Sequence, residues 1–219
     1  MHVCGIQGTL PFGDIVQAHV DVARRRLAGG DTPERPALPE GQWPEIQAWR
    51  RVYAEMGLQP TQVRCAAEAL LRRLRQSGQF PQVNPLVDLC NSVSVRAAVP
   101  IAVFDCGKID WPLTVARANG DEVFLNFAGE VEHPATAEVI FVDGARRAHA
   151  RRWAHRQSGR SAVRPGTESV LIVVEAFHEG APATIAAALG WLEEAFMRQP
   201  GCVVTRRVLN ASSPEFVSV

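Results

Sequence analysis

The sequence predicts an α+β fold in which helices flank a mixed or antiparallel sheet. Segments with helical periodicity and short apolar segments typical of strands come in separate runs along the chain, which favours this class over a doubly wound parallel sheet. Asp143-Gly144 stands between two strand-like segments and is a strong hairpin signal, so at least one strand pair should be antiparallel. The chain has 219 residues, of which 47% are hydrophobic. This length suits one domain with a buried core, and we expect residues 1–219 to form it.

The first part of the chain is predicted to be mainly helical. An opening strand is expected around residues 2–9, and residues 29–44 are dense in Gly and Pro, which indicates a loop. Helices are expected near residues 14–27, 45–56 and 61–76. The last of these has Thr61 as its expected N-cap and Gly78 as its stop, with Val63, Leu70, Leu71 and Leu74 on its buried side.

A further helix is predicted to begin directly after Asn84. Asn is a favoured N-cap residue, and Pro85 suits the first helical position, where no backbone donor is needed. Asn84, Asp88 and Asn91 recur at i, i+4 and i+7 and so share one face, while Leu86, Val87, Leu89, Cys90 and Val93 cover the rest. A polar stripe of this kind is either a solvated face or one wall of a pocket.

Strands are predicted to predominate after this helix. Residues 99–105 form an apolar run typical of a buried strand, and further strands are expected at residues 122–127, 138–143 and 170–176. The Asp143-Gly144 turn should join the strand at 138–143 to the segment that follows it. A last helix is expected over residues 184–199, and residues 202–209 are a candidate final strand.

The composition argues against several classes of protein. The formal net charge is zero, so any affinity for nucleic acid must come from local clustering of charge. The five cysteines are odd in number and form no CxxC pair, which indicates reduced thiols and no structural zinc site. The sequence has no 18-residue apolar run and no signal-like N-terminus. We therefore expect a soluble cytoplasmic protein without a metal, a cofactor or a membrane partner.

One segment carries a family resemblance. The pattern PxxNPLVDLxNxVSxxxxxPxxxxD, from Pro81 to Asp105, closely resembles the B3/B4 domain of the phenylalanyl-tRNA synthetase beta subunit, and especially free-standing proteins made of that domain alone. The motif-bearing core extends over about residues 49–176. In the synthetase this is the editing domain, which hydrolyses tyrosine wrongly attached to the phenylalanine tRNA. The resemblance implies a single B3/B4-type domain that acts as a trans-acting editing factor.

The resemblance also implies a set of pocket residues. Asn91 matches an Asn of the family's editing pocket, and Asp88 lies one turn before it on the same face. We expect these two as the catalytic groups, with Asn91 orienting water and Asp88 binding the substrate's ammonium. A purely structural role for Asp88, pairing with an arginine or capping backbone, is the alternative. The remaining expected pocket residues are Asn84, Cys90, Ala102, Gln157 and Ser158.

Two positions depart from the synthetase's pattern. Ala102 stands where the synthetase has a pocket His, and the loop at residues 157–161 lacks the synthetase's Glu. These departures put tyrosine specificity and hydrolysis itself in question. Cys90 is a conceivable thiol nucleophile with His149 or His155 as its base, but it shares the apolar side of its helix, which favours a small core residue instead.

The segment from Ala145 to Arg164 is strongly basic. It contains seven arginines and no acidic residue. Guanidinium groups bind phosphate, and Trp153 offers a surface on which a terminal base can stack. Strand alternation would divide the arginines between two faces, and a general preference of this chain for Arg is the competing explanation. The candidate tRNA-binding residues are Arg151, Arg152, Trp153, Arg156 and Arg160.

These observations converge on one hypothesis and leave a second open. The first is an aminoacyl-tRNA deacylase that hydrolyses the ester of a mischarged tRNA without a metal, with aminoacyl-tRNA as its partner and a synthetase as a further candidate partner. The second is a non-catalytic module of the same fold that binds tRNA or a small molecule. The sequence does not say which amino acid or which tRNA is recognised.

Overall fold

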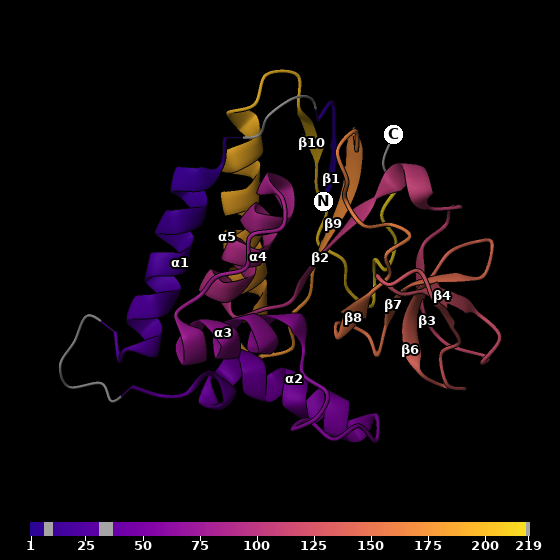
Figure 1. Cartoon of the computed structure of the whole chain (residues 1–219), viewed down its shortest axis with the longest axis horizontal. Helices are drawn as coiled ribbons and strands as arrows, with labels where there is room; N and C mark the ends of the chain where they lie inside the picture. Colours follow the sequence, from indigo (N-terminus) through magenta and orange to yellow (C-terminus); the bar gives the residue numbers. More distant parts are fainter. Residues whose placement is uncertain (7–10, 31–36, 218–219) are drawn as a thin grey trace.

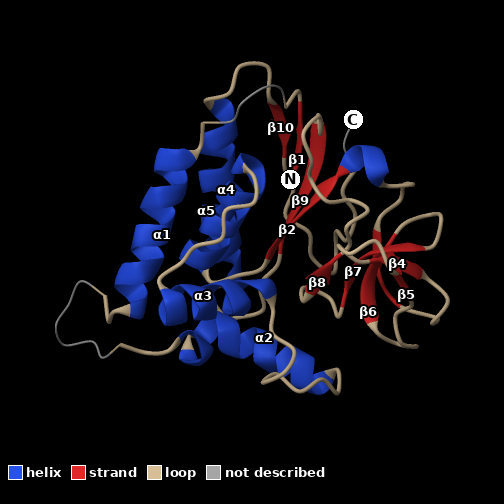
Figure 2. Ribbon diagram, viewed as in Figure 1, coloured by secondary structure: helices blue, strands red, loops and turns tan. Residues whose placement is uncertain are grey.

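The computed structural model describes residues 1–6, 11–30 and 37–217 (Figure 1). Within these ranges the chain forms five α-helices and two β-sheets. Figure 2 shows three layers, with the helices on one side, one sheet in the middle and the other sheet on the far side. The α+β class is thereby confirmed, with one antiparallel and one mixed sheet.

The helices lie close to their predicted positions. They are α1 (Gly13–Leu27), α2 (Pro44–Glu55), α3 (Ala66–Ser77), α4 (Pro85–Ala97) and α5 (Ala181–Met197), with short 3-10 helices at Glu40–Gln42 and Cys106–Lys108. Gly78 ends α3 in a left-handed conformation at φ 68°, as predicted. Asn84 caps α4, because its side chain accepts a hydrogen bond from the Val87 N–H.

The start of α3 differs from the prediction. The helix begins at Ala66 rather than after Thr61, and residues 60–63 form a turn in which the Val63 N–H donates to the Gln59 carbonyl. The chain just before α3 is held by a distant segment, since the Ala66 N–H donates to the Ala154 carbonyl. This long-range contact takes the place of the first helical turn, and a local sequence pattern cannot reveal it.

The middle layer, which we call sheet A, has the strand order β10-β1-β9-β2 and is antiparallel throughout. Its strands are β1 (His2–Cys4), β2 (Ile101–Asp105), β9 (Ser169–Val174) and β10 (Val203–Thr205). The predicted opening strand is thus confirmed over three residues, and residues 7–10 fall outside the described part of the chain.

Sheet A is covered on both faces. Ile101, Val103, Val170 and Ile172 pack with the helices, whereas Ala102, Phe104, Leu171 and Val173 pack towards the other sheet. Alternate residues of a strand point to opposite faces, so a strand buried on both sides must be apolar throughout. This explains why the segments at 99–105 and 170–176 have continuous rather than alternating apolar patterns.

The outer layer, sheet B, has the order β3-β6-β7-β4-β5, and β8 pairs with β7. Its strands are β3 (Thr114–Arg117), β4 (Val123–Leu125), β5 (Val131–Glu132), β6 (Val139–Val142), β7 (Arg147–Arg151) and β8 (Arg156–Gln157). The β6–β7 hairpin is antiparallel and turns at Asp143-Gly144, as predicted, whereas β4 and β7 run parallel. Phe104, Ile109, Phe141 and Ala150 join the two sheets through a shared apolar cluster.

Candidate functional site

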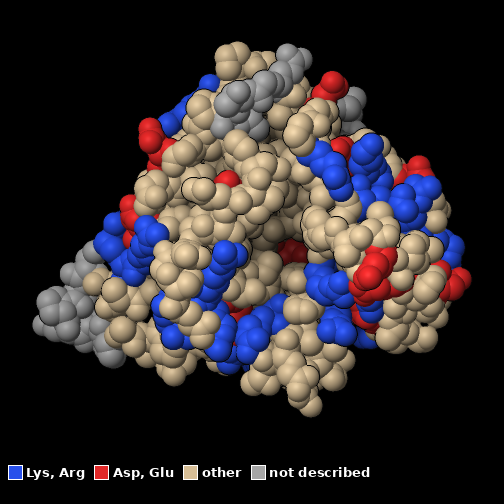
Figure 3. Space-filling view, in the orientation of Figure 1, with Lys and Arg blue, Asp and Glu red and all other residues tan. Residues whose placement is uncertain are grey.

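A pocket lies where sheet A meets sheet B, and we call it the junction pocket. Its walls come from four parts of the chain: the first residue of α3, the start of β2, the β6–β8 region of sheet B, and Glu175 just after β9. Figure 3 shows this face of the molecule hollowed between the helical part and sheet B, with acidic atoms deep in the hollow. The lining residues are Ala66, Pro100, Ile101, Ala102, Phe141, Ala150, Trp153, Ala154, His155, Arg156, Gln157 and Glu175.

The turn between β7 and β8 builds one wall of the junction pocket. Arg152 and Trp153 both adopt left-handed backbone conformations, with φ of 47° and 57°. Such conformations are unfavourable for residues other than glycine and persist only where the surroundings hold them. Here the Trp153 N–H donates to the Val139 carbonyl, and the Ala154 carbonyl accepts from the Ala66 N–H. The turn is therefore fixed from both sides, and it carries Trp153 and His155 to the pocket.

Glu175 is the most unusual group in the junction pocket. It follows β9, where alternation from Leu171 and Val173 directs it to the face that meets sheet B. Its Oε1 accepts a hydrogen bond of 2.8 Å from Trp153 Nε1. Burial among protein atoms raises the pKa of this carboxyl to about 7, and the Trp153 hydrogen bond opposes that shift only in part. Near neutral pH, Glu175 can therefore gain or lose a proton.

His155 is a second titratable group in the junction pocket. Its Nδ1 lies 2.7 Å from the Arg64 carbonyl oxygen, which can only accept, so Nδ1 carries the proton. Burial lowers the pKa of His155, and the nearby Arg152 and Arg156 charges act in the same direction. The imidazole is consequently neutral at physiological pH. Its Nε2 has a free lone pair and no hydrogen-bond partner among the described residues.

Two of the predicted pocket residues line the junction pocket and a third lies beside it. Ala102 and Gln157 belong to its wall, and the Gln157 side chain is held by a hydrogen bond of 2.6 Å from Nε2 to the Val103 carbonyl. Ser158 is fully buried next to Gln157 and donates from its hydroxyl to the Leu125 carbonyl. The structure thus brings together the predicted residues of β2 and of the β8 region.

The predicted polar residues of α4 lie elsewhere. Asp88 accepts a hydrogen bond of 2.8 Å from the Val83 N–H and lines a separate groove between α1, α3 and the start of α4. The Asn84 side chain caps α4 and donates to the Val163 carbonyl. Asn91 is half-buried, lines neither the groove nor the junction pocket, and makes no side-chain hydrogen bond within the described part of the chain. Its amide therefore remains available to a ligand.

Cys90 is a core residue in this structure. Its side chain is 1% exposed among apolar neighbours of α1, α5 and sheet A. This burial raises the pKa of the thiol to about 12, so the thiolate is absent at neutral pH. The His149 ring is engaged by other side chains, because its two nitrogens bond Ser161 Oγ at 2.8 Å and Asp143 Oδ2 at 3.1 Å.

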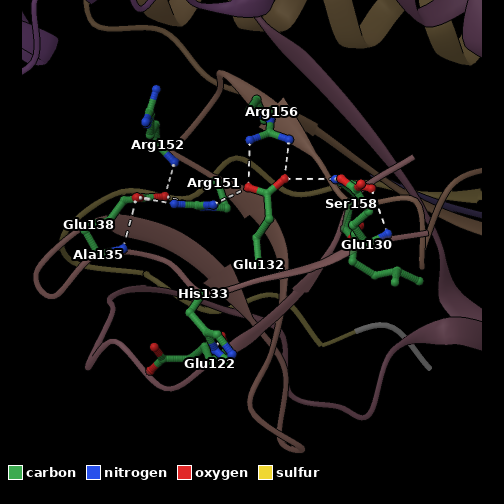
Figure 4. Close-up of polar contacts among 12 residues, drawn as sticks. Glu122, Glu130, Glu132, His133, Ala135, Glu138, Arg151, Arg152, Arg156 and Ser158 are labelled. Carbon is green, nitrogen blue, oxygen red and sulfur yellow. Dashed lines mark hydrogen bonds and ion pairs between the residues drawn. The ribbon is translucent and has the colours of Figure 1, made fainter. Parts of the chain in front are cut away.

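Acidic residues from neighbouring strands neutralise much of the basic segment. Figure 4 shows Glu132 between Arg151 and Arg156, and Arg151 also binds Glu138. The Arg156 guanidinium contacts both oxygens of Glu132, at 2.9 and 2.8 Å. Arg147 pairs with Asp110, and Arg146 pairs with Asp121 and Glu122. Four of the seven arginines are thus held by carboxylates that lie outside the segment.

Three arginines of the basic segment keep their charge uncompensated. Arg152, Arg160 and Arg164 make no ion pair with the acidic residues that the structure describes. Figure 4 shows the Arg152 side chain pointing away from Glu132 and Glu138, while its backbone N–H donates to Glu138. Trp153 is half-buried, and its ring packs against Trp49 and Phe177. Of the predicted tRNA-binding residues, Arg152 and Arg160 are the ones left free to bind phosphate.

Sequence reasoning did not identify Glu175 as a site residue and considered His155 only as a base for Cys90. The available signal for Glu175 was an acidic residue at the end of an apolar strand, where ionisation is costly. For metals, the described residues contain no cluster of three or more His, Cys, Asp or Glu side chains arranged to hold an ion. Each helix in the described ranges is too short or too polar to span a bilayer.

Comparison with known proteins defines the class. The family model of the B3/4 domain matches residues 48–211 of this chain. The protein belongs to the B3/4 domain family, which confirms the resemblance of the Pro81–Asp105 segment. A search of curated proteins found no match.

A solved structure with detectable similarity is an N-terminal fragment of the phenylalanyl-tRNA synthetase beta-subunit from Pyrococcus horikoshii. The two share 14% sequence identity and superpose with a TM-score of 0.42 over 52% of this chain. The match spans 42% of that fragment. Similarity at this level does not transfer the synthetase's activity to the chain.

Proposed function

We propose that this chain is a trans-acting aminoacyl-tRNA editing factor, which hydrolyses the ester of a mischarged tRNA in the junction pocket without a metal. The observation that carries the proposal is the meeting of Ala102 and Gln157, both expected pocket positions, with the neutral imidazole of His155. Membership of the B3/4 family supports the same assignment.

The chemistry requires few protein groups. The His155 Nε2 lone pair accepts a proton from water as its oxygen attacks the ester carbonyl, and the resulting imidazolium returns that proton to the departing ribose oxygen. Gln157 is fixed by its bond to Val103, so its amide oxygen can orient the attacking water. The neighbouring ribose hydroxyl of the substrate can donate to the developing oxyanion. Asn91 and Asp88, the catalytic groups expected from the sequence, lie on α4 outside the junction pocket and define an alternative location for the same reaction.

The decisive experiment is a deacylation assay on a panel of correctly and incorrectly charged tRNAs. Selective release is expected from the wild-type protein, and His155→Ala should lower its kcat by about 100-fold or more, as is usual for loss of a general base. His133→Ala is the matched control, because this exposed imidazole lies outside the junction pocket. Release from no tRNA by the wild-type protein would refute the proposal.

Asn91→Ala separates the two proposed locations of catalysis. If the junction pocket alone performs hydrolysis, Asn91→Ala keeps near-normal turnover. A large loss of turnover at near-normal tRNA affinity in Asn91→Ala, with an active His155→Ala protein, would instead place catalysis at α4.

The second candidate function is a non-catalytic module that binds a small molecule. The ion pairs of Arg146, Arg147, Arg151 and Arg156 favour it, because they leave little free charge for a tRNA backbone. This candidate predicts ligand binding in the junction pocket without accelerated release of any amino acid from tRNA.

A further inference from the structure

Glu175 differs from the other enclosed glutamates of the described chain in having no basic partner. Glu40 binds Arg75 at 2.6 Å, Glu68 binds Arg50 at 2.5 Å, and Glu138 binds Arg151 at 2.9 Å. Glu122 pairs with Arg146 at 3.3 Å. An enclosed carboxylate is costly unless it is paired, and this protein pairs each of these four with arginine.

The basic groups near Glu175 do not neutralise the charge of its carboxylate. Arg156 lines the same pocket, but its guanidinium is bound to both oxygens of Glu132. His155 is neutral, since its pKa is lowered, and its proton is held by the Arg64 carbonyl. Tyr53 of α2, which also interacts electrostatically with Glu175, has a raised pKa and stays neutral.

One oxygen of Glu175 is free. Oε1 accepts from Trp153, whereas Oε2 has no hydrogen-bond partner among the described residues and is not sealed from the pocket. The surrounding wall is mainly aliphatic and aromatic, with Ile101, Phe141 and Trp153 in the lining. Attraction between a carboxylate and a cation is stronger in such surroundings than in water.

We propose that Glu175 receives the primary ammonium group of an α-amino acid or of its carboxyl derivative, with the ligand's side chain against the apolar wall. This inference deepens the proposed function and rests on it for one point, namely that the ligand in the cell is the aminoacyl end of a tRNA. The ammonium supplies the cation that the chain itself does not provide, and Oε2 accepts its hydrogen bond.

The test uses amino-acid amides, which keep the ammonium and lack a hydrolysable ester. Alaninamide, valinamide and phenylalaninamide, each with its N-acetylated counterpart, are titrated into the 219-residue chain by calorimetry at pH 7.5. At least one free amide should bind, and its N-acetyl form should bind at least 10-fold more weakly. Glu175→Gln should cause a similar loss, whereas Glu179→Gln, an exposed neighbour of the same charge, should bind as the wild type does.

Proton release provides an independent readout. Burial gives Glu175 a pKa of about 7, so at pH 6 it is mostly protonated and must ionise to hold an ammonium. Binding at pH 6 should then release about one proton per ligand, measured in buffers of different ionisation enthalpy, and Glu175→Gln should release none. Equal affinity for acetylated and free amides, an unaffected Glu175→Gln protein, or no binding of any amide at millimolar concentration would overturn the inference.

The two proposals fail in distinguishable ways. Amide binding that depends on Glu175, without deacylation of any tRNA, would retain the ammonium site and remove the editing function. Selective deacylation that is unchanged in Glu175→Gln would retain editing and remove the ammonium site.

Discussion

At the residue scale, Glu175 links folding stability to pH. Its pKa rises from 4.5 to about 7 on folding, so the folded state binds a proton more tightly than the unfolded state does. Stability therefore declines as the pH rises from about 4.5 to about 7, because the enclosed carboxyl must ionise with only the Trp153 N–H to stabilise its charge. The shift corresponds to at most about 3 kcal/mol.

His19 and His155 have lowered pKa values, so their deprotonation makes stability rise with pH over part of the same range. The effect of Glu175 is therefore measured as the difference in stability between Glu175→Gln and the wild type. Relative to the wild type, Glu175→Gln should gain unfolding free energy at pH 8 and gain little at pH 5. Urea denaturation at both pH values measures this difference, with Glu179→Gln as the control. An equal effect of Glu175→Gln at both pH values would contradict it.

Cys90 provides a second prediction at this scale. Because its thiol is buried and un-ionised, Cys90→Ala should leave the rate of deacylation unchanged and lower stability by about 1 kcal/mol through lost packing. Single-turnover kinetics and urea denaturation check the two parts. Loss of turnover in a correctly folded Cys90→Ala protein would revive a thiol mechanism.

At the element scale, α4 depends on its first residues. Asn84 satisfies the Val87 N–H and ties the helix to the Val163 carbonyl, so both bonds are lost together in Asn84→Ala. We expect this substitution to reduce stability by about 1–2 kcal/mol. Thermal or urea unfolding measures the loss, with Gln82→Ala, an exposed position before the cap, as the control. A change below that of Gln82→Ala would mean that Asn84 does not stabilise the helix.

The elements that the sequence predicted well are those specified locally. Asn84 and Pro85 define the start of α4, Gly78 defines the end of α3, and Asp143-Gly144 defines a hairpin, each through the conformational preference of one or two residues. The start of α3 was misplaced because Arg64 and Ala66 bind the β7–β8 turn, which lies far along the chain; the Arg64–His155 contact spans 91 residues. Contacts of this kind leave no local pattern.

In the candidate site, too, the locally specified features could be predicted and the long-range contacts could not. Ala102 and Gln157 were expected in one pocket and both line the junction pocket, whereas the sequence did not show that four arginines of the basic segment are paired with carboxylates. Its arginines meet Glu132 and Glu138, which belong to other strands, and only the sheet register brings them together. Glu175 was not predicted as a site residue because nothing next to it in the sequence shows that it has no basic partner among the described residues.

At the scale of the whole molecule, the ion pairs limit how tRNA binding can depend on salt. Each phosphate contact contributes about 0.7–0.9 to the slope of log K against log salt. Three uncompensated arginines, Arg152, Arg160 and Arg164, therefore predict a slope of about −2 to −3. Fluorescence anisotropy with labelled tRNA between 50 and 200 mM salt, a range chosen because counterion release is large there, measures it.

Arginine substitutions show which residues contribute to the salt dependence of tRNA binding. Arg152→Ala combined with Arg160→Ala should make the slope shallower by about 1.4–1.8, and Arg147→Ala, whose guanidinium is paired with Asp110, should leave it unchanged. A wild-type slope near −6 would instead show that more basic residues than these three contact phosphate, and a shallower slope in Arg147→Ala would then identify the paired arginines among them.

The position of the junction pocket also implies that a bound ligand would connect the two sheets. Its walls are shared between sheet A, the start of α3 and sheet B, so it sits on the seam along which the two sheets meet. A ligand bound there would contact residues of both sheets and restrict their motion relative to each other. The β7–β8 turn, which carries Trp153 and His155, would then exchange its amide hydrogens more slowly in the liganded protein, while the far edge of sheet B would exchange as before.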